Sequence, residues 1–386
     1  MLRRLRFDVS QSRGRRYPEP DHPYRNPFQR DRDRVIHARA FRRLEAKTQV
    51  FPQGLSDHFR NRLTHTIEVS QIARTVASVL ELDQDLTEAL ALGHDIGHPP
   101  FAHAGEEELD RQMSRFGDHF DHNQHALRIV ETFEQRYARF PGLNLTFEVR
   151  EGIAKHSADF APGEFPELDE YLPGLRPPLE AQLIDLADEV AYNAADLDDG
   201  FAAGMILPAD IVRDVPQYRE IYEAVETQFP GASDRERFQE ALRRLIDTLV
   251  SGLIEGTAAQ ARASGAADAT EVRQVSYRLA AFTAEVAETD RLLKRFLRAN
   301  LYSAPAIHAE RTLSMTMIAA LFELFLNHPE RMPEPYLDAT RNRPVHRVVC
   351  DYIAGMTDGF FRRTWQQILD QSSVVVKLES SADRTP

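Results

Sequence analysis

The decapeptide at residues 94–103, HDIGHPPFAH, concentrates side chains that can bind a metal ion and move protons. It contains three imidazoles and one carboxylate, and the adjacent His94 and Asp95 offer a nitrogen and an oxygen ligand from one short stretch of backbone. Gly97 and the two prolines that follow interrupt regular structure, so the later histidines can turn back toward the same point. A packed core has no use for this composition, which indicates a metal-centred active site.

Four residues make up the primary metal-binding constellation: His65, His94, Asp95 and Asp188. His65 lies early in one predicted helix, the His94-Asp95 pair ends another, and Asp188 lies within a third. A shell of nitrogen and oxygen ligands suits Mn²⁺, Fe²⁺ or Mg²⁺ and leaves positions for water and a phosphate oxygen. With Cys350 as the only cysteine, an all-sulfur zinc site is excluded.

Two of these ligands also have a plain structural interpretation, which is harder to apply to the His94-Asp95 pair. Alone, His65 would be a structural histidine, and Asp188 a capping or surface carboxylate. Ile184 and Val190 nevertheless place Asp188 near a buried face, where an unpaired carboxylate is costly and a metal ion removes the cost. Eight of the 14 histidines lie between residues 58 and 125, and this density favours a joint site.

The elements that position these residues are predicted to be helical throughout, because apolar residues recur at helical spacing and no alternating strand series is present. The fold class is therefore all-α. One predicted helix begins near residues 83–85 and runs into the His94-Asp95 pair. The other predicted helices cover residues 30–44, 62–80, 104–113, 123–139, 179–197, 209–225 (interrupted at Pro216), 234–255, 271–300, 303–325, 347–353 and 358–369.

The remaining segments predict connectors. Residues 1–27 look like a mobile or loosely packed arm, and residues 51–58, 256–269 and 329–344 like loops. Residues 161–178 form a proline-rich connector, and the tail from residue 372 is expected to be frayed. We accordingly expect an N-terminal arm (1–27), a catalytic core (28–205), a C-terminal helical region packed on it (206–371) and a flexible tail (372–386).

The whole-chain properties narrow the function classes. A net charge of −13 over 386 residues argues against a general nucleic-acid binder, and single-stranded nucleic acid is not indicated as a partner. No apolar run is long enough to span a membrane, and no signal peptide is recognisable. The single cysteine fits a reducing compartment, so the cytoplasm is expected. Arginines crowd residues 30–62; they predict either a solvated helix face or a surface for one polyanionic ligand.

The order of the blocks resembles a known family. The H…HD…D arrangement resembles the HD-domain superfamily of metal-dependent phosphohydrolases. Four blocks, at residues 40–50 (AFRRLEAKTQV), 60–74 (RNRLTHTIEVSQIAR), 93–106 (GHDIGHPPFAHAGE) and 351–358 (DYIAGMTD), look like the bacterial dGTPases and dGTPase-like deoxynucleoside triphosphate (dNTP) triphosphohydrolases. The resemblance covers roughly residues 25 to 370, and it implies an HD-type helical bundle elaborated by C-terminal helices.

The resemblance also implies a reaction: hydrolysis of a dNTP at the α-phosphorus, giving deoxynucleoside and intact triphosphate. One metal ion per site is expected, with a second accompanying the triphosphate as an open alternative, and the ion would polarise the α-phosphate and activate water. The family assigns His103 and Glu106 to acid–base catalysis, and their spacing puts both on one helix face. His98 and His122 match positions that reach the phosphates.

Substrate contacts are carried over from the same resemblance. Arg62 matches an arginine that contacts the nucleotide, and Gln49 matches a residue near the sugar 3′-hydroxyl. Tyr192 and Asp196 follow Asp188 on one helix face and match deoxyribose-recognition positions. A tyrosine ring where a 2′-hydroxyl would lie is a physical means of rejecting ribonucleotides. Lys155 and His156 are counted as phosphate contacts.

Two other functions stay open at this point. One is another HD-type enzyme, a nucleoside monophosphatase or a phosphodiesterase; the other is a non-catalytic nucleotide sensor on an HD scaffold. Members of the family assemble as oligomers, often hexamers, and some are activated by dNTPs between subunits. We therefore expect a homo-oligomer, a dNTP substrate and a dNTP allosteric activator.

Overall fold

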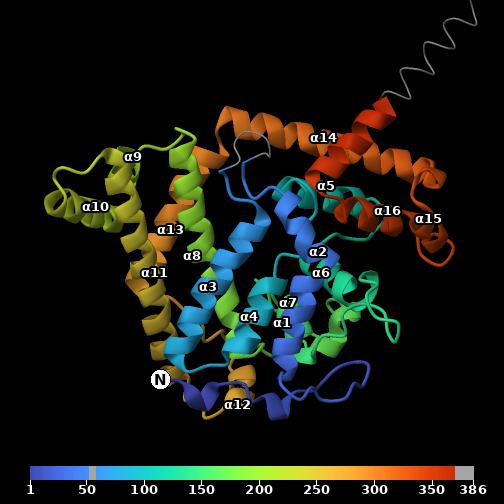
Figure 1. The fold of residues 1–386 in the computed structure, drawn as a ribbon, viewed down its shortest axis with the longest axis horizontal. Coiled ribbons are helices and arrows are strands. Elements are labelled where there is room, and N and C mark those ends of the chain that lie inside the picture. The colour runs from blue at the N-terminus through green and yellow to red at the C-terminus, as the bar shows by residue number, and fades with distance from the viewer. Residues whose placement is uncertain (52–57, 370–386) are drawn as a thin grey trace, which may run out of the picture.

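The computed structural model describes residues 1–51 and 58–369, and within these ranges the chain is built of helices with no β-strand (Figure 1). The all-α prediction is thus confirmed. The α-helices are α1 (Pro27–His37), α2 (Arg39–Arg43), α3 (Arg62–Leu80), α4 (Gln84–Gly93), α5 (Ala102–Ser114), α6 (His122–Arg128), α7 (Phe147–Ala154), α8 (Leu179–Ala202), α9 (Pro208–Asp214), α10 (Pro216–Gln228), α11 (Asp234–Ser264), α12 (Ala269–Gln274), α13 (Ala284–Leu297), α14 (Pro305–Asn327), α15 (Glu334–Ala339) and α16 (Val345–Ala354), followed by a helix over 358–369.

The centre of the molecule is the packing of α3 against α4 and α8. α3 begins where the Asn61 side chain accepts a hydrogen bond from Thr64 N and the Thr64 hydroxyl accepts one from Asn61 N, a reciprocal cap that satisfies free N–H groups. The Asp83 side chain caps α4 in the same way by accepting from Leu86 N. These local signals explain why sequence alone places the starts of both helices well.

A second apolar cluster lies apart from the core around α3, α4 and α8. α14 packs against α5 and α16, and its buried residues include Ile318, Leu321 and Phe322. In Figure 1, α14 crosses the top of the molecule with α5 and α16 beneath it. α13 lies against α8, so helices from the C-terminal third of the chain flank the elements that carry the predicted metal ligands.

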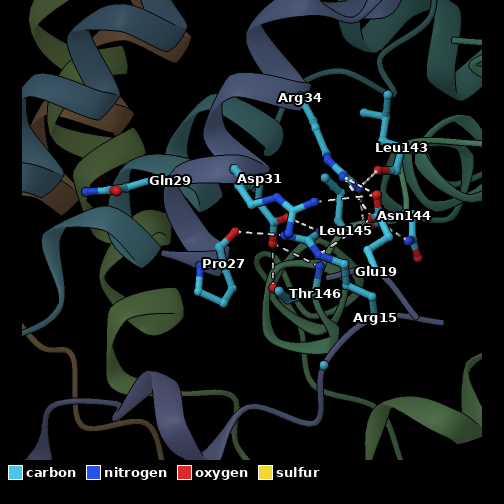
Figure 2. Close-up of polar contacts among 12 residues, drawn as sticks. Arg15, Glu19, Pro27, Gln29, Asp31, Arg34, Leu143, Asn144, Leu145 and Thr146 are labelled. Carbon is cyan, nitrogen blue, oxygen red and sulfur yellow. Dashed lines mark hydrogen bonds and ion pairs between the residues drawn. The ribbon is translucent and has the colours of Figure 1, made fainter. Parts of the chain in front are cut away.

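The first seven residues pack against the body, which corrects the expectation of a mobile or loosely packed arm for this part of residues 1–27. Leu2, Leu5 and Phe7 are buried, and Phe7 N donates to the buried Glu180 carboxylate at 2.9 Å. Further along, the Asp31 carboxylate accepts from Arg15 Nη1 at 2.5 Å and from Thr146 N at 2.9 Å (Figure 2). Buried charges are stable when paired and hydrogen-bonded, as these are.

Two predicted helices differ from those in the structure: one ends early and the other is divided into two. The helix expected over 123–139 ends with a π-helical turn at Ile129–Phe133, because the chain folds back and Leu143 N donates to Val130 O. The helix expected over 271–300 is divided into α12 and α13. Between them, Leu279 N donates to Gln182 Oε1 on α8 at 2.6 Å, a tertiary bond that replaces the helical one.

Two predicted loops are partly helical. α11 continues to Ser264 through most of the segment expected as a loop at 256–269, and it ends at Gly265, whose φ is +71°. The segment 329–344 contains a 3₁₀ turn at Pro329–Arg331 and α15. Most of the predicted loop 51–58 and the whole tail from residue 372 lie outside the described residues. Within the described chain, no helix combines the length and apolar character needed to cross a bilayer.

Candidate active site

The structure brings the four predicted metal ligands together from three helices. His65 on α3 has its Nε2 2.7 Å from Asp188 Oδ1 on α8. His94, directly after α4, has its Nε2 3.5 Å from Asp95 Oδ1 and 3.9 Å from Asp188 Oδ1. Both histidines and Asp95 are buried, whereas Asp188 is partly exposed.

The atoms in this cluster fit a divalent cation. His94 Nδ1 lies 2.6 Å from Ala91 O, so the ring donates there and turns the lone pair of Nε2 toward the carboxylates. That buried Nε2 has no hydrogen-bond partner. A nitrogen lone pair facing two carboxylate oxygens is unfavourable without a cation between them. Histidine ligands of metals hold their second nitrogen on a backbone carbonyl in this manner.

The charges around the cluster hold the carboxylates ionised. Burial opposes this, but the Arg62 guanidinium keeps the pKa of Asp95 well below its usual range. The bond from His65 similarly overcomes burial and lowers the pKa of Asp188. Ionised carboxylates are the form that binds a metal.

Arg62, predicted to contact the nucleotide, is buried at the start of α3, and its Nη1 donates to Asp95 Oδ2 at 2.8 Å. Its visible partner is therefore a metal-ligand carboxylate. Three more arginines of the predicted basic surface form ion pairs: Arg34 with Glu19, Arg32 with Glu88, and Arg60 with Asp199. These pairs favour the plain interpretation of the arginine-rich stretch as paired helix faces.

A group of histidines around one carboxylate adjoins the metal cluster. Glu106 Oε1 accepts from His122 Nδ1 at 2.7 Å and from His122 N at 3.1 Å. The ring of His122 stacks on that of His98, with centroids 3.9 Å apart. His103 Nδ1 lies farther from Glu106 Oε2, at 3.8 Å, and its side chain is 64% exposed. His98 Nδ1 lies 3.0 Å from Asp95 Oδ1, so the two groups are continuous.

A cavity of about 570 Å³ opens beside these histidines. Gln49, His103 and Tyr192 line its near side, and the first turn of α5 borders it without a side-chain cap. The far wall comes from α13, α14 and the turn between them: Lys294, Arg298, Tyr302, Ile307, Glu310, Arg311 and Ser314. The mixture of aromatic, cationic and acidic groups can receive a polyanionic ligand with a polar ring system.

Gln49 and Tyr192 line this cavity, and Asp196 lies behind its wall in contact with Tyr302. The buried Oε1 of Gln49 has no hydrogen-bond partner. Asp196 is buried and accepts a hydrogen bond from the hydroxyl of Tyr302, whose ring lies 6.0 Å from that of Tyr192. Burial raises the pKa of Asp196 to about 7, because the hydrogen bond from Tyr302 offsets only part of the effect of burial.

Lys155 and His156, which were predicted together as phosphate contacts, have different surroundings in the structure. Lys155 Nζ is buried and donates to Glu151 Oε1 at 3.0 Å and to two backbone carbonyls, at residues 172 and 175. The structure thus gives Lys155 a set of partners away from the metal cluster. His156 lies beside the cluster, with its ring 5.1 Å from that of His94 and its Nδ1 2.8 Å from Asp185 Oδ1.

Tyr302 and the cavity-lining residues of α13 and α14 were missed by sequence reasoning. They occur in segments without a motif, and only the apolar periodicity of those helices is visible in the sequence. A lone Tyr302 carries no signal for a site, because its contact with Asp196 joins positions more than 100 residues apart.

Comparison with known proteins agrees with this geometry. The HD domain family matches residues 62–193, and the phosphohydrolase-associated domain matches residues 280–367. The protein is thus a phosphohydrolase of the HD type.

The chain is 46% identical over 352 residues to a deoxyguanosinetriphosphate triphosphohydrolase-like protein of Geobacter sulfurreducens, covering 90% of each chain. It is 44% identical over 366 residues to the protein of the same description from Caulobacter sp. strain K31, covering 92% of each. The chain belongs to this deoxyguanosinetriphosphate triphosphohydrolase-like family.

Proposed function

We propose that this protein hydrolyses deoxynucleoside triphosphates at the α-phosphorus with a divalent metal ion, releasing the deoxynucleoside and inorganic triphosphate. The observation that carries the proposal is a cavity lined by His103, which adjoins the histidine–carboxylate group, and by Tyr192, which lies one helical turn after Asp188 on α8. The names of the relatives at 42–46% identity support the same substrate class.

In this mechanism, His65, His94, Asp95 and Asp188 would hold the ion. When bound, a divalent ion polarises the α-phosphate and lowers the pKa of water. Mn²⁺, Mg²⁺ and Fe²⁺ all suit the nitrogen and oxygen ligands, and a second ion could accompany the triphosphate. Arg62 keeps Asp95 ionised and oriented. Asp185 likewise keeps the ring of His156 protonated and oriented, and this ring faces the phosphates.

Proton transfer falls to the histidine group. His103, at the edge of the cavity, donates a proton to the departing 5′-oxygen, because an alkoxide is a poor leaving group. The carboxylate of Glu106 orients both rings: its Oε2 faces His103 and its Oε1 accepts from His122. His98, stacked on His122 and next to Asp95, joins this group to the metal ligands.

Recognition of deoxyribose falls to Gln49, Tyr192 and Asp196. The free Oε1 of Gln49 can accept a bond from the sugar 3′-hydroxyl. The Tyr192 ring, backed by Tyr302, fills the space that a 2′-hydroxyl would need. A ribonucleotide would have to displace this ring or bury its hydroxyl without a partner, and both are costly.

The test is a hydrolysis panel of the four dNTPs, singly and mixed, with Mn²⁺, Mg²⁺ or Fe²⁺, in which ion-exchange chromatography resolves the phosphate products. Triphosphate is the expected product. Release of pyrophosphate or monophosphate would contradict the proposal and favour another HD-type activity. Tight nucleotide binding without turnover under every metal would favour the sensor.

The variant Asp95→Ala controls for a contaminating hydrolase, because it should abolish the triphosphate peak while wild-type protein prepared in the same way retains it. Full activity in Asp95→Ala would contradict the assignment of the metal site.

We also propose that the protein works as a homo-oligomer, with a hexamer as the expected form, and that dNTPs act as activators. The support is family membership. Light scattering with and without dNTPs tests assembly, and a strict monomer under both conditions would contradict it. A mixed-dNTP reaction that is no faster than the sum of the single reactions would contradict activation.

A further inference from the structure

The backbone directly before His103 has an unusual conformation. Phe101 has φ +62° and Ala102 has φ +54°, so two consecutive residues with side chains lie in the left-handed region. This region is unfavourable for such residues, and two in succession persist only where the surroundings hold them. The pair forms the start of α5 and determines where its first turn, including His103, faces the cavity.

One carboxylate from the distant end of the chain holds this backbone. Asp358, at the start of the helix over 358–369, is buried, and its Oδ1 accepts from Phe101 N at 3.1 Å. Its Oδ2 accepts from Thr48 N at 2.9 Å and from the Thr48 hydroxyl. Three donors thus converge on the two oxygens of a single side chain.

The two anchored segments are neighbouring parts of the same cavity wall. Thr48 precedes Gln49, and Phe101 lies two residues before His103; all four residues line the cavity. Asp358 itself is not among the residues that line it. A neighbouring contact adds support, since Lys47 Nζ donates to the backbone carbonyls of His98 and Ala354.

We propose that Asp358 is a positioning residue that sets the placement of His103 relative to Gln49. The proposal rests on the function proposed above, in which His103 protonates the leaving oxygen and Gln49 meets the sugar. Displacing a proton donor by about 1 Å from its working geometry costs on the order of 100-fold in rate. The aspartate matters here as an acceptor of three hydrogen bonds, and its charge need not touch the substrate.

The substitution Asp358→Asn separates this role from general stability. An amide has one oxygen and one NH₂ group, so in either orientation a donor faces Phe101 N or Thr48 N. The matched control is Asp351→Asn, in the same sequence block. Asp351 is equally buried, accepts from Arg128 and Arg343, and contacts neither anchored segment.

The activity test compares a natural dNTP with an analogue whose 5′-bridging oxygen is replaced by sulfur, because a thiolate leaves without being protonated. Asp358→Asn should lower kcat for the oxygen substrate about 30- to 100-fold and that for the sulfur substrate less than about 5-fold. Asp351→Asn should change both by the same small factor. Equal losses on both substrates in Asp358→Asn would overturn the positioning role.

A second readout does not depend on turnover. Amide hydrogen exchange in peptides covering residues 98–104 and 47–50 should accelerate at least about 10-fold in Asp358→Asn and stay unchanged in Asp351→Asn, because the buried amides lose their acceptor. Unchanged exchange would overturn the proposal. If wild-type protein releases no triphosphate, the proposed function fails on that result, while the exchange experiment still decides whether Asp358 anchors the segment.

Discussion

At the scale of single residues, the clustering of the proposed metal ligands could be predicted from sequence because they occur in motifs of unusual composition. His94 and Asp95 are adjacent, and histidine next to aspartate before a glycine is rarely a feature of a core. The partners of Lys155 could not be predicted in this way. Its ammonium donates to carbonyls of the 161–178 connector, and the path of an irregular segment is set by tertiary contacts.

Asp188→Asn tests the cluster at this scale. The substitution keeps the shape of the side chain but removes the charge that faces His65 and His94. We expect Mn²⁺ affinity, measured by isothermal titration calorimetry, to fall by more than about 100-fold. Asp247→Asn, an exposed aspartate on α11, is the control and should bind Mn²⁺ like the wild type. Equal affinities for both variants would remove Asp188 from the ligand set.

At the scale of elements, helices whose ends are determined by neighbouring residues could be predicted well. Helices whose ends are determined by distant tertiary contacts could not. α3 begins and ends as predicted because its Asn61–Thr64 cap is encoded within four residues. The division between α12 and α13 depends on Gln182, about 100 residues earlier in the chain. Apolar periodicity continues across that division, so the sequence alone predicts one helix.

The contact between the motif turn and α6 gives a prediction for Gly97. A Cβ atom at this position would lie 2.0 Å from His122 O and 2.5 Å from Ala126 N, and backbone atoms cannot move away cheaply. Gly97→Ala should therefore lower the free energy of unfolding by about 3 kcal/mol and disturb His122, reducing activity as well.

Gly231→Ala is the matched control, because a Cβ atom there meets nothing within 4 Å. Thermal unfolding followed by circular dichroism measures both variants. A wild-type unfolding midpoint for Gly97→Ala would show that α6 does not approach the turn this closely.

At the scale of the whole molecule, the N-terminal segment is an integral part of the core. The buried Glu180 on α8 accepts hydrogen bonds from the backbone of Phe7 and of Asp83, so one carboxyl joins the first residues, α4 and α8. Sequence reasoning treated residues 1–27 as a loose arm, because proline and arginine content signals irregular structure and does not reveal burial. The Arg15–Asp31 contact in Figure 2 strengthens the same attachment.

Glu180 also predicts how stability depends on pH. Burial raises the pKa of Glu180 from 4.5 to about 7, although bonds from the Asp83 and Phe7 amides oppose the rise. The folded protein then binds this proton more tightly than the unfolded chain does. The protonated Glu180 carboxyl contributes fully to the free energy of unfolding below pH 4.5. This contribution declines by about 3 kcal/mol in all as the pH rises through 7.

Glu180→Gln stays uncharged and should not show this decline, so its stability relative to wild type should increase between pH 5 and pH 8. Denaturant unfolding across that pH range measures the difference. Glu220→Gln, on the exposed face of α10, should give a curve parallel to that of the wild type. A parallel curve for Glu180→Gln would show that Glu180 is ionised throughout the range.

The two walls of the cavity have different origins in the chain, and this has a consequence for how such a protein can change over generations. The wall that carries His103 is tied to the ion cluster, whereas the opposite wall belongs to α13, α14 and the turn between them, which contribute no residue to that cluster. Codon changes in these two helices can therefore alter which ligand is accepted while the proposed ion-binding residues are inherited intact. A mutant library restricted to residues 294–314 is accordingly the most economical starting point for redirecting its preference.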